Sequence, residues 1–206
     1  MLQINNNVSK ITFLFAHGAG ADMNSDWMVK FDQLLSEQGI EVIRFNFPYM
    51  IKRLEEGTRR PPDRAPKLLE AFKQQIELIP KNRKLLIGGK SMGGRMASLL
   101  AAEGELERKI AGVICLGYPF HPPKKLEKYK GMHLADIKTP TLILQGERDT
   151  MGTKLEIADF DLSNSVKVKY LGDGDHSFKP RVKSGLTLEL NIQSASRLVI
   201  EFMKVI

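Results

Sequence analysis

A serine flanked by two nearby glycines lies where an apolar segment ends and a segment with a helical pattern begins. The segment Gly89-Lys90-Ser91-Met92-Gly93 has the pattern G-x-S-x-G. The sharp turn made by this pattern leaves no room for side chains two residues either side of the serine, which explains both glycines. The following helix directs its positive end and the Met92 N–H toward a developing oxyanion. We therefore predict a nucleophilic Ser91 with Met92 as one oxyanion donor; a simple β-α turn with a serine cap is the alternative.

Two other residues, both much later in the chain, could activate this serine. Asp149 lies in LILQGERDT and His176 in GDGDHSF, each after a predicted strand. A serine hydroxyl is a poor nucleophile until an imidazole accepts its proton, and that imidazole needs a carboxylate to fix its tautomer. The chain order Ser91, Asp149, His176 is the order of nucleophile, acid and base in hydrolases with this serine motif. We predict these three as the catalytic residues.

Other carboxylates offer competing assignments. Asp159 and Asp161 could supply the acid, but they fall on or after a predicted helix. Asp173 and Asp175 neighbour His176 and could bind a metal with it. However, no second histidine lies at ligand spacing, and the chain has neither an H-E-x-x-H motif nor paired cysteines. We expect no metal and no cofactor.

A glycine-rich segment, His17-Gly18-Ala19-Gly20, follows the first predicted strand. An oxyanion hole takes its second N–H from this loop, and we assign that donor to Ala19. Gly18 would let the backbone come close to the substrate. His17 is expected to anchor the loop through hydrogen bonds rather than to act as a second base. A phosphate-binding turn is the alternative, but the spacing of G-x-G-x-x-G and the P-loop lysine are absent.

Three further features concern the substrate. The segment Tyr118–Pro123 could stiffen a pocket wall with His121 facing the acyl group, although a rigid turn with a solvent-exposed His121 fits equally well. Arg95 could pair with a carboxylate below the serine turn or reach an anion of the substrate, and we expect the pairing. A basic cluster after His176 motivates the hypothesis that anionic substrates are preferred. Its members are Lys179, Arg181 and Lys183.

The elements that must position these residues alternate between strand and helix. Strands are predicted over residues 11–16, 41–47, 84–89, 109–117, 141–146 and 166–172, and helices over 25–38, 67–79, 91–103, 153–158 and 186–206. Nearly continuous apolar runs separated by amphipathic helices favour strands buried on both faces of a parallel sheet. We predict a doubly wound, mostly parallel α/β sheet of about six strands, with its site outside the carboxyl ends of the strands.

The connections between these elements indicate an open site. Residues 118–139 are too few for a helical cap, so no large cap domain is expected, which disfavours lipases that bury long acyl chains under a lid. Residues 48–66 are read as a Pro-rich, charged connection. Compact or surface-presented esters therefore fit better as substrates.

Composition fits one ordinary globular domain over residues 1–206. The chain has 42% apolar and 27% charged residues, with 17 Gly and 10 Pro. Its single cysteine, Cys115, lies in an apolar run and is expected to be a buried strand residue rather than a redox thiol. No apolar stretch is long enough for a membrane span or a signal-peptide core. We expect a soluble, unprocessed, cytoplasmic protein that does not engage a membrane.

The chain carries a net charge of +7, from 31 Lys and Arg against 24 Asp and Glu. The excess lies in two places: Lys52, Arg53, Arg59, Arg60, Arg64 and Lys67 form the first, and Lys124, Lys125, Lys128 and Lys130 form the second. Neither interleaves the aromatic residues expected of a nucleic-acid stacking surface. We therefore expect no nucleic-acid partner.

Five segments, FAHGAGADMN, GGKSMGGR, LGYPFHPP, LQGERDTMG and GDHSF, occur in the order shown by a known group. The sequence resembles small α/β-hydrolases related to the dienelactone hydrolases and, within them, the testis-expressed-protein-like and bacterial relatives. The resemblance implies a triad of Ser91, Asp149 and His176 with oxyanion donors at Met92 and Ala19, but no known substrate. Dienelactone hydrolases themselves use cysteine at the position of Ser91, so their lactone chemistry is not carried over.

The sequence thus favours a serine hydrolase that cleaves a carboxylic ester or thioester through an acyl-Ser91 intermediate. A non-catalytic interaction module of the same fold is the rival, with the basic segments around Arg59 and Lys125 as its docking surface. A nucleotide-binding α/β protein would be a third class, but it lacks a phosphate motif. The oligomeric state is left open.

Overall fold

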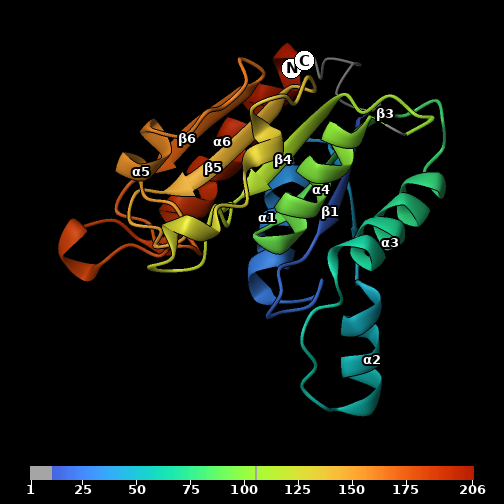
Figure 1. Ribbon diagram of the computed structural model, residues 1–206, viewed down its shortest axis with the longest axis horizontal. Helices are drawn as coiled ribbons and strands as arrows, with labels where there is room; N and C mark the ends of the chain where they lie inside the picture. Colours follow the sequence, from blue (N-terminus) through green and yellow to red (C-terminus); the bar gives the residue numbers. More distant parts are fainter. Residues whose placement is uncertain (1–10, 105) are drawn as a thin grey trace.

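The computed structural model describes residues 11–104 and 106–206, which form a single six-stranded sheet (Figure 1). Its strands are β1 (Ile11–Ala16), β2 (Glu41–Phe45), β3 (Lys84–Lys90), β4 (Gly112–Leu116), β5 (Thr141–Gly146) and β6 (Val166–Leu171). They are ordered β2-β1-β3-β4-β5-β6, and every neighbouring pair is parallel. The predicted doubly wound α/β sheet is confirmed, and all strands end at one edge.

Helices cover both faces of the sheet. The helices are α1 (Asp26–Ser36), α2 (Pro48–Glu56), α3 (Ala65–Glu77), α4 (Met92–Glu103), α5 (Lys154–Ala158) and α6 (Leu188–Val205). Side chains of α1 and α6 pack on one face, and those of α2, α3, α4 and α5 pack on the other. No helix in the described part of the chain is long and apolar enough to cross a membrane.

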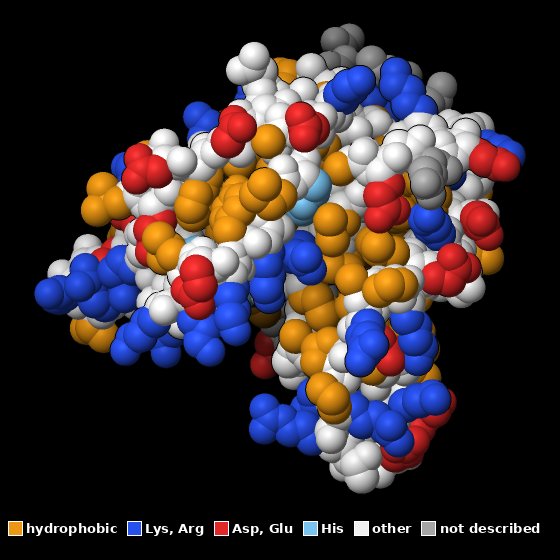
Figure 2. Space-filling model, viewed as in Figure 1, with side chains coloured by type: hydrophobic (Ala, Val, Ile, Leu, Met, Phe, Trp, Pro, Cys, Tyr) orange, Lys and Arg blue, Asp and Glu red, His pale blue; other side chains and the backbone are white. Residues whose placement is uncertain are grey.

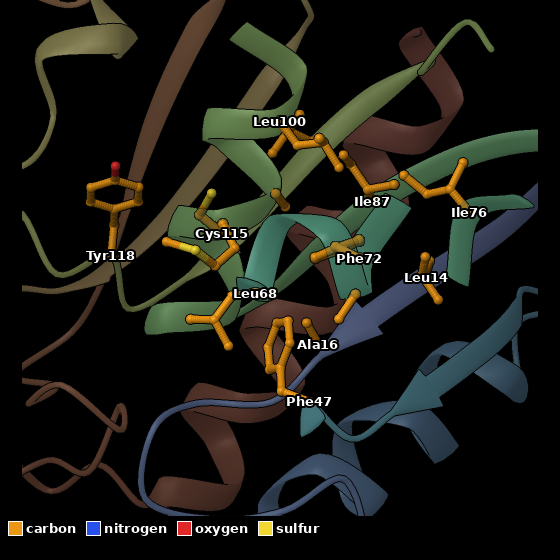
Figure 3. Close-up of a cluster of buried hydrophobic side chains, with 14 of the residues drawn as sticks. Leu14, Ala16, Phe47, Leu68, Phe72, Ile76, Ile87, Leu100, Cys115 and Tyr118 are labelled. Atoms are coloured by element: carbon orange, nitrogen blue, oxygen red, sulfur yellow. The ribbon is translucent and has the colours of Figure 1, made fainter. Parts of the chain in front are cut away.

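The two faces bury two separate hydrophobic cores because side chains alternate along each strand. In β1, Phe13 points into the core under α1 and α6, whereas Leu14 and Ala16 point into the core under α3 and α4. Figure 3 shows the second core, where Phe72 of α3 lies among side chains of the central strands. Nearly every residue of β1 is buried in one core or the other, which explains the continuous apolar sequence of this strand.

The segment predicted as a connection, residues 48–66, contains a helix, so that prediction is wrong. Pro48 begins α2, and α3 begins at Ala65, with Pro66 in its first turn. Proline is well suited to these places, since the first helical N–H groups have no intrahelical partner and proline fixes a helical φ. Figure 1 shows α2 standing away from the rest of the molecule, beside the edge where the strands end.

The connection between β4 and β5 has no helical cap, as predicted. It contains two short 3-10 turns, η2 (Leu126–Lys128) and η3 (Met132–Leu134). Cys115 is fully buried in β4, and this burial raises the pKa of its thiol, in agreement with the prediction of an inert strand residue.

Candidate active site

Ser91 occupies a strained turn between β3 and α4. Its backbone has φ 50° and ψ −114°, a conformation that residues other than glycine rarely adopt. A Cβ at Gly89 would lie 2.5 Å from the Ala16 carbonyl oxygen, and one at Gly93 would lie equally close to that oxygen. Only glycine therefore allows β1 and the start of α4 to approach this closely. The packing supports the turn and leaves the Ser91 side chain partly exposed.

A continuous line of hydrogen bonds joins Ser91, His176 and Asp149. The distance from Ser91 Oγ to His176 Nε2 is 2.8 Å, and that from His176 Nδ1 to Asp149 Oδ2 is 2.7 Å. The Asp149 carboxylate is fully buried, whereas the His176 side chain is 26% exposed. Because Asp149 can only accept when ionised, His176 Nδ1 carries a proton and Nε2 is free to accept one from Ser91.

Gln145 holds the Asp149 carboxylate in place, a role that sequence reasoning missed. Its Nε2 donates to Asp149 Oδ2 at 2.8 Å and to the Tyr118 carbonyl oxygen at 3.0 Å. The Met151 N–H donates to the other carboxylate oxygen, Oδ1, at 2.9 Å. The signal in the sequence was a polar side chain within the apolar run LILQG, which must find partners when buried.

The loop carrying His176 rests on the ends of β3 and β4. Lys90 Nζ donates to the His176 carbonyl oxygen at 2.7 Å, and it lies over the rings of Trp27 and Phe178. Gly117 has φ 67°, and a Cβ there would lie 2.6 Å from the same carbonyl oxygen. Burial lowers the pKa of Lys90 to about 8. Lys90, read from sequence only as a variable position of the serine motif, therefore helps to position the imidazole.

The glycine-rich loop after β1 is fixed by hydrogen bonds on both sides. His17 Nδ1 donates to the Gly18 carbonyl oxygen at 2.6 Å, and His17 Nε2 accepts from the Phe47 N–H at 3.1 Å. His17 is fully buried, and this burial lowers its pKa. The ring is therefore neutral and occupied at both nitrogens, which agrees with the predicted anchoring role.

Tyr49 of α2 adds a second anchor to this loop. Its hydroxyl donates to the carbonyl oxygens of Gly18 and Ala19, at 3.3 and 3.1 Å. Burial raises the pKa of Tyr49 to about 12, so it stays a donor at neutral pH. A Cβ at Gly18 would lie 3.6 Å from Ser91 Cβ, which places the loop beside the serine. The assignments of Gly18 to the substrate and of Ala19 and Met92 to the oxyanion stay predictions.

The competing carboxylates are engaged elsewhere. Asp173 pairs with Arg181 and with Arg148, and the hydrogen bond from Arg181, followed by the nearby charges, lowers the pKa of Asp173 to about 2. Asp175 Oδ1 accepts from two backbone N–H groups of its own loop. Within residues 11–104 and 106–206, no three potential ligands cluster in a way that could hold a metal ion.

His121 is buried rather than solvent-exposed, so the alternative of an exposed histidine in a rigid turn is wrong. Its Nδ1 lies 3.0 Å from the Pro122 carbonyl oxygen, and its Nε2 lies 3.5 Å from a Glu156 carboxylate oxygen. The ring packs edge-on against Phe160. Its predicted contact with the acyl group remains untested.

Among the described residues, Arg95 does not pair with a carboxylate, which corrects the expected ion pair. Its Nε is buried and has no hydrogen-bond partner, and no Asp or Glu in the described residues lies within ion-pair distance of its guanidinium. The sequence places Arg95 one helical turn after Ser91 but does not show which side chains surround it.

This fold and this serine turn define the α/β-hydrolase class. The sequence matches the family of α/β hydrolase domains over residues 9–204, and the chain belongs to that family.

Solved structures support the same fold. The chain resembles Est1E from Butyrivibrio proteoclasticus at 14% identity, covering 97% of this chain and 90% of that one, with a TM-score of 0.66. It resembles dienelactone hydrolase from Anabaena variabilis at 22% identity, covering 93% and 86%, with a TM-score of 0.65. It also resembles an α/β serine hydrolase without a lid from Xanthomonas campestris at 20% identity, covering 93% and 83%, with a TM-score of 0.64. At these identities the likeness concerns the fold alone.

Proposed function

We propose that this protein is a serine hydrolase that cleaves a carboxylic ester or thioester through an acyl-Ser91 intermediate. The observation that carries the proposal is the unbroken line of hydrogen bonds from Ser91 through His176 to the buried Asp149. Each bond lies within the ordinary length range, and the three groups are ordered as nucleophile, base and orienting acid. The motif resemblance to the testis-expressed-protein-like branch is part of the same proposal.

The geometry suggests a two-step reaction. Ser91 Oγ attacks the carbonyl carbon while His176 Nε2 takes its proton, and the ionised Asp149 stabilises the imidazolium. His176 then gives this proton to the departing alcohol or thiol, leaving the acyl group on Ser91. Water attacks the acyl group in the second step, with His176 again as base, and Ser91 recovers its proton when the acid leaves. These steps use residues of this chain and water, and we propose no cofactor or metal.

The negative charge that develops on the carbonyl oxygen needs donors close to Ser91. Met92 is the first residue of α4, so its N–H has no intrahelical partner and lies at the positive end of the helix. The loop of Gly18 and Ala19 lies against the serine from the other side and is fixed by His17 and Tyr49. We propose the Ala19 and Met92 amides as the two oxyanion donors.

The open edge of the sheet favours a small or exposed ester. The segment between β4 and β5 carries only 3-10 turns, so nothing there forms a chamber for a long acyl chain. The similar protein from Xanthomonas campestris is likewise described as lacking a lid. A cytoplasmic location is also proposed, since the one cysteine is buried and unpaired.

A fluorophosphonate probe tests the proposal, because it labels only an activated serine. We expect stoichiometric labelling of the wild-type protein at Ser91, found by peptide mass spectrometry, and none in Ser91→Ala or His176→Ala. With a substrate ester in hand, each of these variants should lower kcat by about 10⁴. Ser194→Ala on α6, a helix that carries none of the three proposed catalytic residues, is the matched control and should be labelled like wild type.

The rival is a non-catalytic module of the same fold that docks through the basic segments around Arg59 and Lys125. It predicts a folded protein without labelling. That outcome, at a probe concentration that fully labels a known serine hydrolase, would refute the enzymatic proposal.

A further inference from the structure

Arg95 lies close to Ser91, and no counter-charge for it is found among the described residues. It lies in the first turns of α4, and its backbone N–H donates to the Ser91 carbonyl oxygen at 3.1 Å. Its guanidinium Nε is buried and has no hydrogen-bond acceptor, and no carboxylate among the described residues pairs with it. A buried donor without a partner is costly, and a cation near the N-terminus of a helix is further disfavoured by the helix dipole.

The side chains around Arg95 add to the positive charge. Lys130 lies near enough that Arg95 and Lys128 lower its pKa, after the larger effect of burial. Burial and the charge of Arg95 together lower the pKa of His133 to about 4, so that its ring is neutral. The His133 Nε2 atom lies 2.8 Å from Ser98 Oγ, which fixes the ring beside α4. Arg95 and Lys130 thus lie close enough to influence each other electrostatically, and among the described residues neither forms an ion pair with a carboxylate.

This place adjoins the proposed reaction centre. Side chains of a helix lean toward its N-terminus, so Arg95 leans toward the turn that carries Ser91. The charge of Arg95 also reaches Tyr118, whose hydroxyl donates to the Lys130 carbonyl oxygen at 3.3 Å. Tyr118 directly follows Gly117, the residue that contacts the His176 loop. Lys130 and Arg95 are therefore linked to the site through Tyr118.

Several other cations near the strand ends form ion pairs with carboxylates. Arg181 pairs with Asp173, Arg60 with Glu56 and Lys67 with Asp63. Figure 2 shows Lys and Arg side chains on α2 and along the adjoining lower edge of the molecule, with hydrophobic side chains between them. Among these basic groups, Arg95 combines a buried unpaired donor with a place next to the serine.

We propose that Arg95 and Lys130 form a subsite for an anionic group, a carboxylate or a phosphate, carried by the ester or thioester substrate. This inference rests on the proposed hydrolase function and names the substrate class. The guanidinium can offer two parallel donors to two oxygens of such a group, and Lys130 adds a point charge.

The test compares esters that differ only in charge. The nitrophenyl monoester of glutaric acid carries a free carboxylate; a second ester has a primary amide in its place, and a third has a phosphonate. We expect wild-type kcat/KM to favour an anionic ester over the amide by about tenfold or more, the range of a charge-assisted hydrogen bond. The preferred anion, carboxylate or phosphonate, identifies the natural group.

Arg95→Gln should reduce this ratio at least about tenfold. Arg197→Gln, at an exposed position of α6 on the opposite face of the sheet, removes the same charge and should keep the wild-type ratio. If Arg95→Gln does not fold, Arg95→Lys keeps the charge but loses the two-donor geometry, and it should lower the ratio in part. Equal kcat/KM for charged and neutral esters, or an unchanged ratio in the Arg95 variants, would overturn the proposal.

A binding measurement separates failure of the subsite from failure of the hydrolase proposal. Free glutarate is titrated into the Ser91→Ala protein and followed by NMR, without any reaction. We expect a Kd about tenfold weaker when Arg95→Gln is added, and no change when Arg197→Gln is added. If Arg95→Gln weakens glutarate binding but the fluorophosphonate does not label the wild-type protein, the anion site is supported and the hydrolase proposal is rejected. If the glutarate Kd is equal in Ser91→Ala and in its combinations with Arg95→Gln and Arg197→Gln, the anion site is rejected.

Discussion

At the scale of single residues, the proposed site depends on side chains that are each held by a second contact. Gln145 orients Asp149, and Lys90 binds the carbonyl of the residue that carries the imidazole. Both supporting residues are polar groups at the ends of apolar strands, where burial forces them to find partners. Such positioning residues set the geometry on which proton transfer depends, since reaction requires hydrogen-bond distances between the groups.

Lys90 gives the site a measurable dependence on pH. The folded protein has a Lys90 pKa of about 8, against 10.5 for the ordinary side chain, because burial disfavours the charged form. Between these two values the unfolded chain binds a proton that the folded chain has released. The free energy of unfolding should therefore rise with pH between about 8 and 10.5, and this added stability disappears as the pH falls back toward 8.

The measurement is urea unfolding at several pH values for wild type and Lys90→Met, whose side chain fills the space between Trp27 and Phe178. Groups common to both proteins cancel in the difference. We expect wild type to gain about 3 kcal/mol relative to Lys90→Met between pH 8 and 10.5. A difference that is flat across this range would show that Lys90 keeps its ordinary pKa.

At the scale of elements, the serine turn requires a close approach of three backbones. β1, β3 and the start of α4 meet at Gly89 and Gly93 with no space for side chains. Such contacts cannot relax by moving a flexible side chain, because the facing atoms belong to backbone carbonyl groups. The glycines therefore serve the packing of the elements, and the strain at Ser91 is balanced by this packing.

Gly93→Ala tests this packing. The added Cβ would lie 2.5 Å from the Ala16 carbonyl oxygen and 2.7 Å from that of His17, so we expect a loss of about 3 kcal/mol in the free energy of unfolding. Gly20→Ala is the control, since a Cβ there meets nothing within 4 Å, and it should change stability little. Equal denaturant midpoints for the two variants would contradict the argument.

At the scale of the whole molecule, one sheet supports two cores. The core under α1 and α6 and the core under α3 and α4 share the same strands, so neither should survive loss of the other. This arrangement favours a single cooperative transition, and it ties the edge carrying Ser91 and His176 to the stability of the entire domain.

Phe31→Ala and Phe72→Ala probe the two cores separately. Each ring is fully buried, so each change should cost about 3–5 kcal/mol and lower one common melting temperature. Far-UV circular dichroism follows the whole molecule, whereas fluorescence of Trp27, the single tryptophan, follows the face of α1. Leu155→Ala, at an exposed position of α5, is the control and should be nearly neutral. Transitions that separate between the two signals would disprove the shared cooperativity.

Much of this architecture could be predicted from local sequence patterns. The six strands and the serine turn follow from apolar runs, glycine spacing and helix signals, because these constraints act between neighbours in the chain. The order Ser91, Asp149, His176 then restricts the three side chains to one edge, since parallel strands share their carboxyl ends. The sequence patterns do not predict helix α2, because Pro48 reads as a break, although proline is favourable in the first turn of a helix.

The sequence by itself determined which residues could act as nucleophile, base and acid, and on which edge of the sheet they would lie. Only the tertiary structure decided how these residues are held and what surrounds them. Gln145 contacts Asp149 and Lys90 contacts the His176 loop. Arg95 has no carboxylate partner within the described part of the chain, although an ion pair was expected. The physical reason is that partners of long polar side chains come from distant segments, and their approach depends on packing, which no local pattern encodes.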